Sequence, residues 1–423
     1  MEASSWKVRP VAKPRSKVCE SPGPAGIYCF SPGILTLPSG RIVVTMDYGG
    51  PGIEGLAGVK KKTIDGVFQG NLFISDDAGY TWTHICEFPF YHARPFQSGS
   101  SLYVLGHADD LMIMRSDDEG LTWSEPCALT KGEHWHQAPC NVLEANGHVY
   151  LVMERVCEPS GVWPVGNIAP VLMRGRIGAD LMQRDNWTFA SEIMFKQAVD
   201  TASLNDFGVP FYEVDPVHGD LVAPGRHCSP PGWLETNVVQ FVDPDHYWTD
   251  PTGHTFHLWM RAHTAGTGYA AVMKVVERED GTMTTQYETV PSGRRAVYVP
   301  CPGGQMKFHI LYDERSRLYW LLSTQSTDSM TRAERLPEGR FHLPNNERQR
   351  LQLHFSRNCI DWCFAALVDA AEPERESRHY ASMAIFEDDL YVLSRSGDER
   401  ASGSHNGNMI TFHVVSGFRD LIY

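Results

Sequence analysis

The chain has 423 residues, of which 42% are hydrophobic and 21% charged, so it is long enough and apolar enough to bury a large core. Its 37 Lys and Arg residues face 51 Asp and Glu residues, a net charge of -14, which argues against a nucleic-acid partner because no broad basic surface is available for phosphates. No stretch approaches the roughly 20 apolar residues that cross a bilayer, so no membrane partner is expected.

Short apolar runs separated by Gly, Pro and Asp recur along the whole chain, whereas long amphipathic helical patterns are scarce. Such runs are typical of strands joined by tight turns. The clearest strand candidates are, in chain order, residues 33–37, 41–46, 102–105, 148–153, 233–241, 258–261, 318–322, 390–393 and 409–415.

One eight-residue pattern occurs twice, at residues 75–82 (SDDAGYTW) and at residues 116–123 (SDDEGLTW). Each copy follows a short apolar run, which predicts a strand that enters a hairpin. In this hairpin the Asp accepts backbone hydrogen bonds, the Gly supplies a positive φ and the Trp packs back on the sheet. A shortened third copy at residues 356–362 (SRNCIDW) has lost its Gly. We expect these Asp residues to be structural.

The repeats and strands together predict an all-β fold, a six-bladed β-propeller of four-stranded antiparallel blades, with seven blades as the alternative. Radial repetition hides sheet edges, and roughly 40 to 70 residues per blade fit the length. The last run, 409–415, is expected to close the ring by sharing a blade with N-terminal residues. We expect a single domain over residues 1–423, with the Pro- and Gly-rich segment at about 207–231 as an insertion over one face.

The repeated pattern is the Asp-box signature, and the chain resembles the sialidases, a class of propeller glycosidases, over most of its length. Residues 30–40 look like the family's Arg-Ile-Pro strand, and residues 235–239 (ETNVV) resemble its Glu-Asn-x-Val-Val-type strand. The residues that correspond to the family's functional positions are Glu235 with Asn237, Arg261 as the second arginine, Arg348 or Arg350 as the third, and Tyr380 at the start of the last blade.

The resemblance implies an exo-acting, retaining glycoside hydrolase that releases a terminal acidic, sialic-acid-like sugar from a glycan and requires no cofactor. A carboxylate on the anomeric carbon of the sugar would repel an anionic nucleophile, and the neutral phenol of Tyr380 avoids that repulsion. Tyrosine has a pKa of about 10, so it needs a base to take its proton, and Glu235 is expected to be that base. Arginines would hold the carboxylate of the sugar through paired hydrogen bonds.

The chain departs from the family at its first arginine, because Phe30-Ser31-Pro32 stands where the family has Arg-Ile-Pro. Arg94 or Arg395 is a candidate to compensate. The family takes its proton donor from the loop before the first Asp box, where this chain offers Asp47, Glu54 and Asp65, and Asp65 has the most similar context. The remaining substrate-binding candidates are Asp47, His136, Arg395 and His405.

Histidines before two strands support a second hypothesis. His136 and His405 lie in turn-rich segments, where an imidazole could act as acid or base near neutral pH. A propeller-type polysaccharide lyase would use His136 and Tyr380 to remove a proton beside a uronate carboxylate. A non-catalytic glycan-binding propeller is the third hypothesis. His134 and His136 form a His-x-His pair, but no further ligand stands at a convincing spacing, so no metal is expected.

The start of the sequence lacks the charged-then-apolar layout of a signal peptide, so we expect a cytoplasmic protein, or a secreted one if a signal was removed. The ten cysteines show no Cys-x-x-Cys pair, which favours reduced thiols. The oligomeric state is left open.

Overall fold

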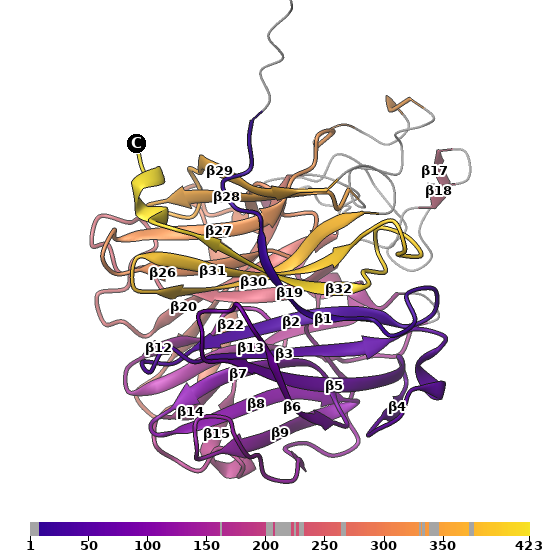
Figure 1. Ribbon diagram of the computed structural model, residues 1–423. Helices are drawn as coiled ribbons and strands as arrows, with labels where there is room; N and C mark the ends of the chain where they lie inside the picture. Colours follow the sequence, from indigo (N-terminus) through magenta and orange to yellow (C-terminus); the bar gives the residue numbers. More distant parts are fainter. Residues whose placement is uncertain are drawn as a thin grey trace, which may run out of the picture.

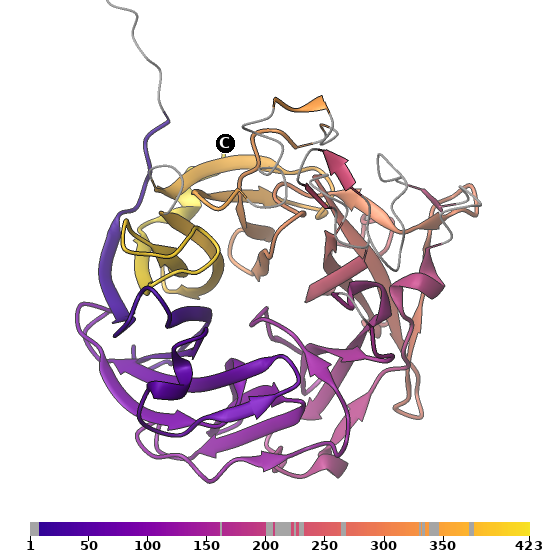
Figure 2. The same cartoon turned by 90° about the vertical axis from the view of Figure 1, so that its right-hand side faces the viewer.

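The chain folds into six four-stranded antiparallel blades that form a ring (Figures 1 and 2). The computed structural model describes residues 8–160, 163–199, 206–207, 221–223, 226–227, 232–263, 268–329, 331, 335–337, 347–371 and 376–423. Within these residues the one α-helix is the four-residue α1 (Phe195–Ala198). The predicted fold class, an all-β six-bladed propeller, is therefore confirmed.

The first three blades follow one another along the chain, and each runs from an inner to an outer strand. The first contains β2 (Tyr28–Thr36), β3 (Ile42–Gly49), β5 (Gly66–Ser75) and β6 (Thr83–Phe88), with β4 (Lys61–Thr63) paired to β5. The second contains β7 (Tyr91–Ser98), β8 (Ser101–Ala108), β9 (Asp110–Ser116) and β10 (Cys127–Ala128). The third contains β11 (Trp135–His136), β12 (Leu143–Ala145), β13 (His148–Val156), β14 (Ile168–Arg176) and β15 (Trp187–Phe189).

The last three blades complete the ring. The fourth contains β19 (Gly232–Val239), β20 (Thr255–His263), β21 (Tyr269–Glu277) and β22 (Met283–Gln286), with β25 (Tyr298–Pro300) paired to β21. The fifth contains β26 (His309–Asp313), β27 (Leu318–Thr324), β28 (Arg350–Ser356) and β29 (Cys363–Ala370). The sixth contains β30 (Ser377–Phe386), β31 (Asp389–Gly397), β32 (Met409–Val415) and β1 (Pro14–Glu20).

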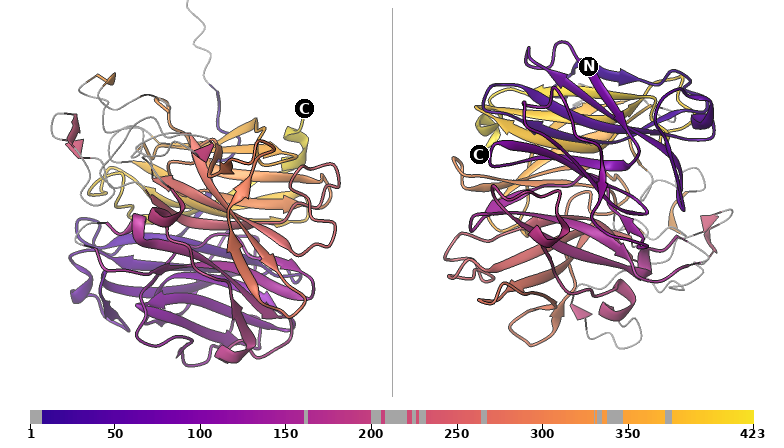
Figure 3. Two further views of the ribbon diagram at one scale, coloured as in Figure 1. Left: turned by 180° about the vertical axis from the view of Figure 1, so that it is seen from behind. Right: turned by 90° about the horizontal axis from the view of Figure 1, so that it is seen from below.

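The two ends of the chain close the ring within the sixth blade. The N-terminal strand β1 pairs antiparallel with β32, from Pro14 opposite His413 to Glu20 opposite Met409. Figure 2 shows the indigo N-terminal strand beside the yellow C-terminal blade, and Figure 3 shows the indigo first blade next to the yellow last blade. The prediction that residues 409–415 share a blade with N-terminal residues is confirmed.

The core consists of six clusters of buried side chains, each shared by two neighbouring blades. Successive side chains of a strand point to opposite faces of its sheet. In β3, Ile42 and Val44 therefore pack towards the sixth blade, while Val43 packs towards the second. The second strand of each blade is covered on both faces, which explains why the sequence shows these strands as continuous apolar runs.

The repeated pattern forms the predicted hairpin turn between the third and fourth strands of the first and second blades. Asp77 Oδ1 accepts a hydrogen bond from the backbone of Thr81 (2.9 Å) and Oδ2 accepts one from its hydroxyl (2.6 Å). Asp118 makes the same two bonds to Thr122. In the shortened third copy, between β28 and β29, Asn358 accepts backbone hydrogen bonds in the same way. These side chains are structural, as expected.

Small elements connect the blades. The predicted insertion at 207–231 lies largely outside the described residues. Its described part includes the hairpin of β17 (Leu221–Ala223) and β18 (Arg226–His227). A short sheet joins β16 (Asp206–Phe207), β24 (Arg295–Ala296) and β23 (Glu288–Thr289). The 3-10 turns are η1 (Ile53–Gly55), η2 (Val165–Asn167), η3 (Arg184–Asn186) and η5 (Phe418–Leu421). In the described parts, no helix has the length and apolarity to cross a membrane, and the nine cysteines are free.

Candidate active site

The innermost strands of four blades carry a bulge at equivalent positions. The pairing registers of β2, β7, β19 and β30 with their neighbours each shift near the start of the strand. A bulge leaves an extra residue that re-aims its side chain. At each bulge a non-glycine residue adopts the left-handed conformation, which costs roughly 1–3 kcal/mol and persists where the surroundings enforce it. These residues are Ser31 (φ 42°), His92 (φ 52°), Glu235 (φ 58°) and Tyr380 (φ 48°).

All four bulged residues line one cavity of about 350 Å³, called here the active cavity. This volume lies near the lower end of the range for small-molecule sites, which suits one sugar unit. The other lining residues are Phe30, Phe68, His136, Ala138, Trp163, Leu234, Arg261, His263, Arg348, Arg395 and His405. The propeller therefore brings together seven of the predicted site residues: Tyr380, Glu235, Arg261, Arg348, His136, Arg395 and His405.

A carboxylate, a guanidinium and a phenol from two blades meet in the active cavity. Arg261, on β20, donates through one nitrogen to Glu235 Oε2 (3.2 Å) and to Tyr380 Oη (2.9 Å). Its Nε donates to the carbonyl of Gln305 (2.9 Å), which fixes the guanidinium. Burial and the negative charge of Glu235 raise the pKa of Tyr380, so the phenol is neutral at neutral pH. The three groups form one hydrogen-bonded unit.

Two further arginines approach the ring of Tyr380. The Cζ atom of Arg348 lies 5.6 Å from the ring centroid and that of Arg395 lies 5.2 Å from it. Arg348 donates to Nδ1 of His379 (2.9 Å), and Arg395 lies 3.3 Å from Nδ1 of His405. Burial and the arginine charges hold the pKa of His379 well below its ordinary value, so it is neutral. The charge of Arg395 first, and then burial, lower the pKa of His405 to about 2.

Among the described residues, basic side chains outnumber acidic ones in the lining of the active cavity. Arg261, Arg348 and Arg395 line it together with Glu235. Burial, followed by repulsion from Arg261, outweighs the attraction of Tyr380 and lowers the pKa of Arg348 to about 10. Burial, followed by repulsion from Arg348, lowers that of Arg395 to about 9. An anionic ligand would relieve both effects, although the whole chain carries a charge of -14.

Arg395 contacts the residue that stands in place of the expected first arginine. Phe30 stands there, and the Arg395 Cζ atom lies 4.1 Å from the centroid of its ring. Arg395 comes from β31, the second strand of the sixth blade, rather than from β2. A third guanidinium therefore reaches the active cavity from a different strand.

Four predicted site residues do not line the active cavity. Asp65 lies beside it, where Tyr91 Oη (2.9 Å) and His134 Nε2 (3.3 Å) contact its Oδ2. Burial alone would raise the pKa of Asp65, but the hydrogen bond of His134 and the charge of His136 outweigh it and lower the pKa to about 2. As the side chain stands, it is ionised and holds no proton to give.

Asp47, Asn237 and Arg350 have structural surroundings. Asp47 is buried and accepts from the backbone of His92 (3.0 Å), and burial raises its pKa to about 7. Asn237 clamps the inner strands of two blades through Phe308 O (3.2 Å) and the backbone N–H of Ile310 (3.0 Å). Arg350 pairs with Glu347. Arg350 is the first residue of β28, whereas Arg348 lies before the strand, and only Arg348 of the two lines the active cavity.

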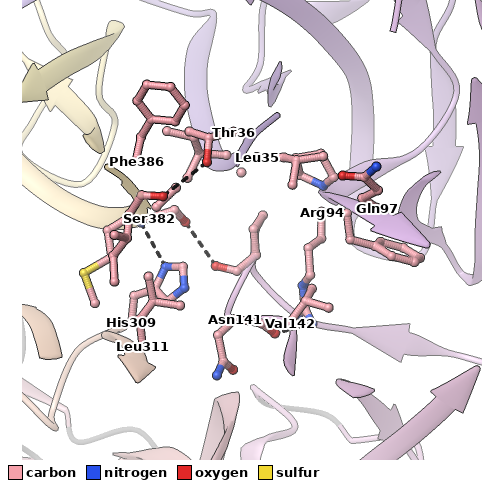
Figure 4. A pocket seen from close by; sticks show the side chains of 18 of the residues that line it. Leu35, Thr36, Arg94, Gln97, Asn141, Val142, His309, Leu311, Ser382 and Phe386 are labelled. Atoms are coloured by element: carbon pink, nitrogen blue, oxygen red, sulfur yellow. Dashed lines mark hydrogen bonds between the residues drawn. The ribbon is translucent and has the colours of Figure 1, made fainter. Parts of the chain in front are cut away.

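A second cavity of about 460 Å³ lies at the other end of the inner strands. Its lining follows the bulges along the same strands, with residues 33–37 of β2 and 382–386 of β30. Figure 4 shows Arg94 there, beside Asn141 and Val142. Arg94 donates to the carbonyls of Asn141 (3.3 Å) and Val152 (3.2 Å). It therefore does not replace the missing arginine.

Sequence reasoning missed several residues of the active cavity. His92 follows an aromatic residue at the start of β7, as His136 does at the start of β11, so its position was a usable signal. Phe68, Trp163 and His263 come from strands and loops that carry no local motif. Among the described residues no group of three or more His, Cys, Asp or Glu side chains is arranged to hold a metal ion.

Solved structures share this fold at low sequence identity. No protein-family model matches the chain, and no curated protein matches its sequence. A protein of unknown function from Dyadobacter fermentans matches 96% of this chain with 99% of its own (12% identity, TM-score 0.52). The Penicillium chrysogenum alpha-L-arabinanase matches 98% of this chain with 100% of its own (12% identity, TM-score 0.50). The Ruminococcus gnavus intramolecular trans-sialidase matches 94% of this chain with 96% of its own (11% identity, TM-score 0.52). At these identities the likeness shows the fold alone.

Proposed function

We propose that the protein is an exo-acting, retaining glycoside hydrolase that releases a terminal acidic sugar from a glycan. The observation that carries the proposal is the convergence of Glu235, Tyr380 and Arg261 within hydrogen-bond reach, beside Arg348 and Arg395. The solved structures that share the fold include an arabinanase and a trans-sialidase, which supports a glycan substrate.

The arginines would bind the carboxylate of the sugar. Guanidinium groups match a carboxylate with paired hydrogen bonds, and three of them in a buried cavity favour an anionic sugar over a neutral one. The cavity volume of about 350 Å³ suits a single terminal unit. Sialic acid and its deaminated relatives, whose carboxylate sits on the anomeric carbon, fit this arrangement best.

Tyr380 is the nucleophile of the proposed mechanism. Its oxygen forms a bond to the anomeric carbon while the glycosidic bond breaks, and its proton passes to Glu235. Water then attacks the same carbon, the bond to Tyr380 breaks, and the phenolate recovers its proton from Glu235. Two displacements retain the anomeric configuration.

A polysaccharide lyase is the second candidate, favoured by His92 and His136 in the wall of the active cavity. A lyase would place a uronate carboxylate against the same arginines and remove the neighbouring proton. A third outcome, a glycan-binding protein without activity, would show binding of the same sugars without turnover.

A screen of aryl glycosides separates the three functions. The substrates are aryl glycosides of sialic acid, of its deaminated relatives and of the common uronic acids, together with uronate oligosaccharides. A hydrolase releases phenol and a free sugar, whereas a lyase forms an unsaturated sugar that absorbs in the near ultraviolet. Release of the sugar with inversion, or formation of unsaturated product, would contradict the proposal.

A further inference from the structure

A buried histidine and glutamate form a pair in the wall of the active cavity that the proposed displacement leaves unused. His136, on β11, lies opposite Glu154, on β13, in the antiparallel register of the third blade. Its Nδ1 lies 3.2 Å from Glu154 Oε2. The two ionisable groups are in contact, and His136 lines the active cavity.

Glu154 is held rigidly by the neighbouring blade. Its second oxygen, Oε1, accepts hydrogen bonds from the backbone N–H (3.0 Å) and from the hydroxyl (2.9 Å) of Thr236. Thr236 directly follows Glu235, the proposed base. The side chain of Glu154 is fully buried, so the carboxylate fixes the orientation of His136 relative to Glu235.

The contact with Glu154 determines which nitrogen of His136 is free. Nδ1 faces the carboxylate, and Nε2, on the other side of the ring, is the nitrogen left for the cavity. The ring also meets Trp163 edge to face (centroids 5.5 Å apart) and His92 (5.3 Å). These contacts restrict the ring to one position.

The surroundings of the pair favour a proton on it near neutral pH. Burial alone would lower the pKa of His136, but the hydrogen bond and charge of Glu154, with Asp65 and Glu235, outweigh it and raise the pKa. Burial also raises the pKa of Glu154. The ionisable groups that face the pair are Glu235 on β19, Asp65 before β5, His134 before β11, His92 on β7 and His107 on β8.

The neighbouring groups are poorer proton donors. Burial and the charge of the adjacent histidines hold the pKa values of His92 and His107 well below the ordinary value, so both are neutral. Asp65 is ionised, with a pKa of about 2, and its oxygen is occupied by Tyr91 and His134.

We infer that His136, oriented by Glu154, donates the proton that the leaving glycosidic oxygen takes up, an inference that rests on the hydrolase function proposed above. In the first displacement the bond from the anomeric carbon to the leaving oxygen breaks, the bond to Tyr380 forms, and the Nε2 proton moves to the leaving oxygen. In the second, His136 takes a proton from the attacking water. The substrates are glycosides whose leaving group is an ordinary sugar alcohol.

The test compares leaving groups that need a proton to different degrees. The His136→Gln variant keeps an amide near the position of Nε2 but holds no acidic proton. It is assayed on aryl glycosides of the accepted sugar, from dinitrophenol to unsubstituted phenol. For phenol we expect kcat/KM to fall roughly 10²- to 10⁴-fold, and for dinitrophenol less than about tenfold. A His148→Gln control, at the half-buried start of β13 and outside the active cavity, keeps the wild-type dependence.

Two results would overturn the inference. One is a loss in His136→Gln that is equal for all leaving groups. The other is a loss in Asp65→Asn that grows as the leaving group becomes more basic. If the wild-type protein releases no phenol from any glycoside, the proposed hydrolase function fails instead.

Two measurements keep the inference testable if His136→Gln does not fold. In Glu154→Gln, where Glu154 is a positioning residue, the basic limb of the kcat/KM profile should move to lower pH, because the imidazolium loses its counter-charge. Nitrogen-15 spectra of the histidines should show the His136 ring protonated at neutral pH in the wild type. A neutral ring, or an unmoved limb, would contradict the assignment.

Discussion

Arg395→Met should make the unliganded protein more stable and weaken its binding of acidic sugars. Arg395 is buried, and burial, followed by repulsion from Arg348, outweighs the attraction of Tyr380 and Asp47 and lowers its pKa to about 9. The fall from the ordinary arginine value corresponds to roughly 5 kcal/mol of destabilisation at neutral pH. Because the folded pKa lies below the unfolded one, this destabilisation is complete below about pH 9 and declines at higher pH.

Other contacts of Arg395 offset part of the gain. The guanidinium donates to the carbonyl of His405, and such charged hydrogen bonds contribute about 1.5–3 kcal/mol. Methionine keeps the packing on Phe30. The expected net gain in the free energy of unfolding is about 2–3 kcal/mol, which for a chain of 423 residues raises Tm by about 2–3 °C.

The same substitution should weaken the binding of an acidic sugar, although it stabilises the unliganded protein. Loss of one charge-assisted hydrogen bond should weaken the binding of an acidic sugar by about 1.5–3 kcal/mol, or roughly 10- to 150-fold. Differential scanning calorimetry gives the stability, and a titration with sialic acid followed by the shift in Tm gives the affinity. Binding of a neutral sugar of similar size should be unchanged.

Arg350→Met is the matched control, because Arg350 pairs with Glu347 outside the active cavity. It should leave the affinity for acidic sugars unchanged. A clear loss of stability in Arg395→Met would mean that Arg395 is a structural residue, and unchanged affinity for acidic sugars would remove it from the binding site.

Four further substitutions test other parts of the structure. Tyr380→Phe should lower turnover at least about 10³-fold and leave the ligand-induced shift in Tm intact, and retained turnover would exclude the phenol as nucleophile. Gly79→Ala should lower the free energy of unfolding by about 2 kcal/mol or more, because the glycine has φ +81° and a Cβ there would lie 2.1 Å from the ring of Phe412. Gly132 has φ +72° and open space around it, so Gly132→Ala should lower the free energy of unfolding by only about 1 kcal/mol. Denaturant unfolding measures both variants, and equal losses of stability in Gly79→Ala and Gly132→Ala would contradict the argument. Asp47→Asn should stabilise the protein by up to about 4 kcal/mol at pH 8 and very little at pH 4, because the folded pKa of Asp47, about 7, exceeds the unfolded value. A stabilisation that does not depend on pH would refute this argument.

Much of the fold could be read from the sequence because local and long-range requirements coincide in a propeller. The second strands of the blades are covered on both faces, so they appear as unbroken apolar runs such as 102–105 and 318–322. The turn residues Asp77 and Asp118 each stabilise the hairpin in which they lie, through hydrogen bonds from residues four positions later in the chain. Both signals are local and survive in a single sequence.

The site was less predictable because its geometry depends on bulges without a sequence signature. A glycine would mark a left-handed position, yet Glu235 and Tyr380 adopt this conformation with full side chains. The motifs that resemble the sialidases identified these residues, together with Arg261 and Arg348. They did not identify Glu154, which is buried in a second strand and is recognised through its contacts with His136 and Thr236.

The backbone strain and the buried arginines both lie at the active cavity. Four left-handed residues sit at bulges of four inner strands, and three guanidinium groups line the same cavity. Strain of roughly 1–3 kcal/mol at each bulge persists because the six shared cores fix every blade against two neighbours. A fold that served packing alone would gain by relaxing these bulges and by replacing the arginines with apolar residues. The proposed binding of an anionic sugar accounts for the occurrence of both costs around one small cavity.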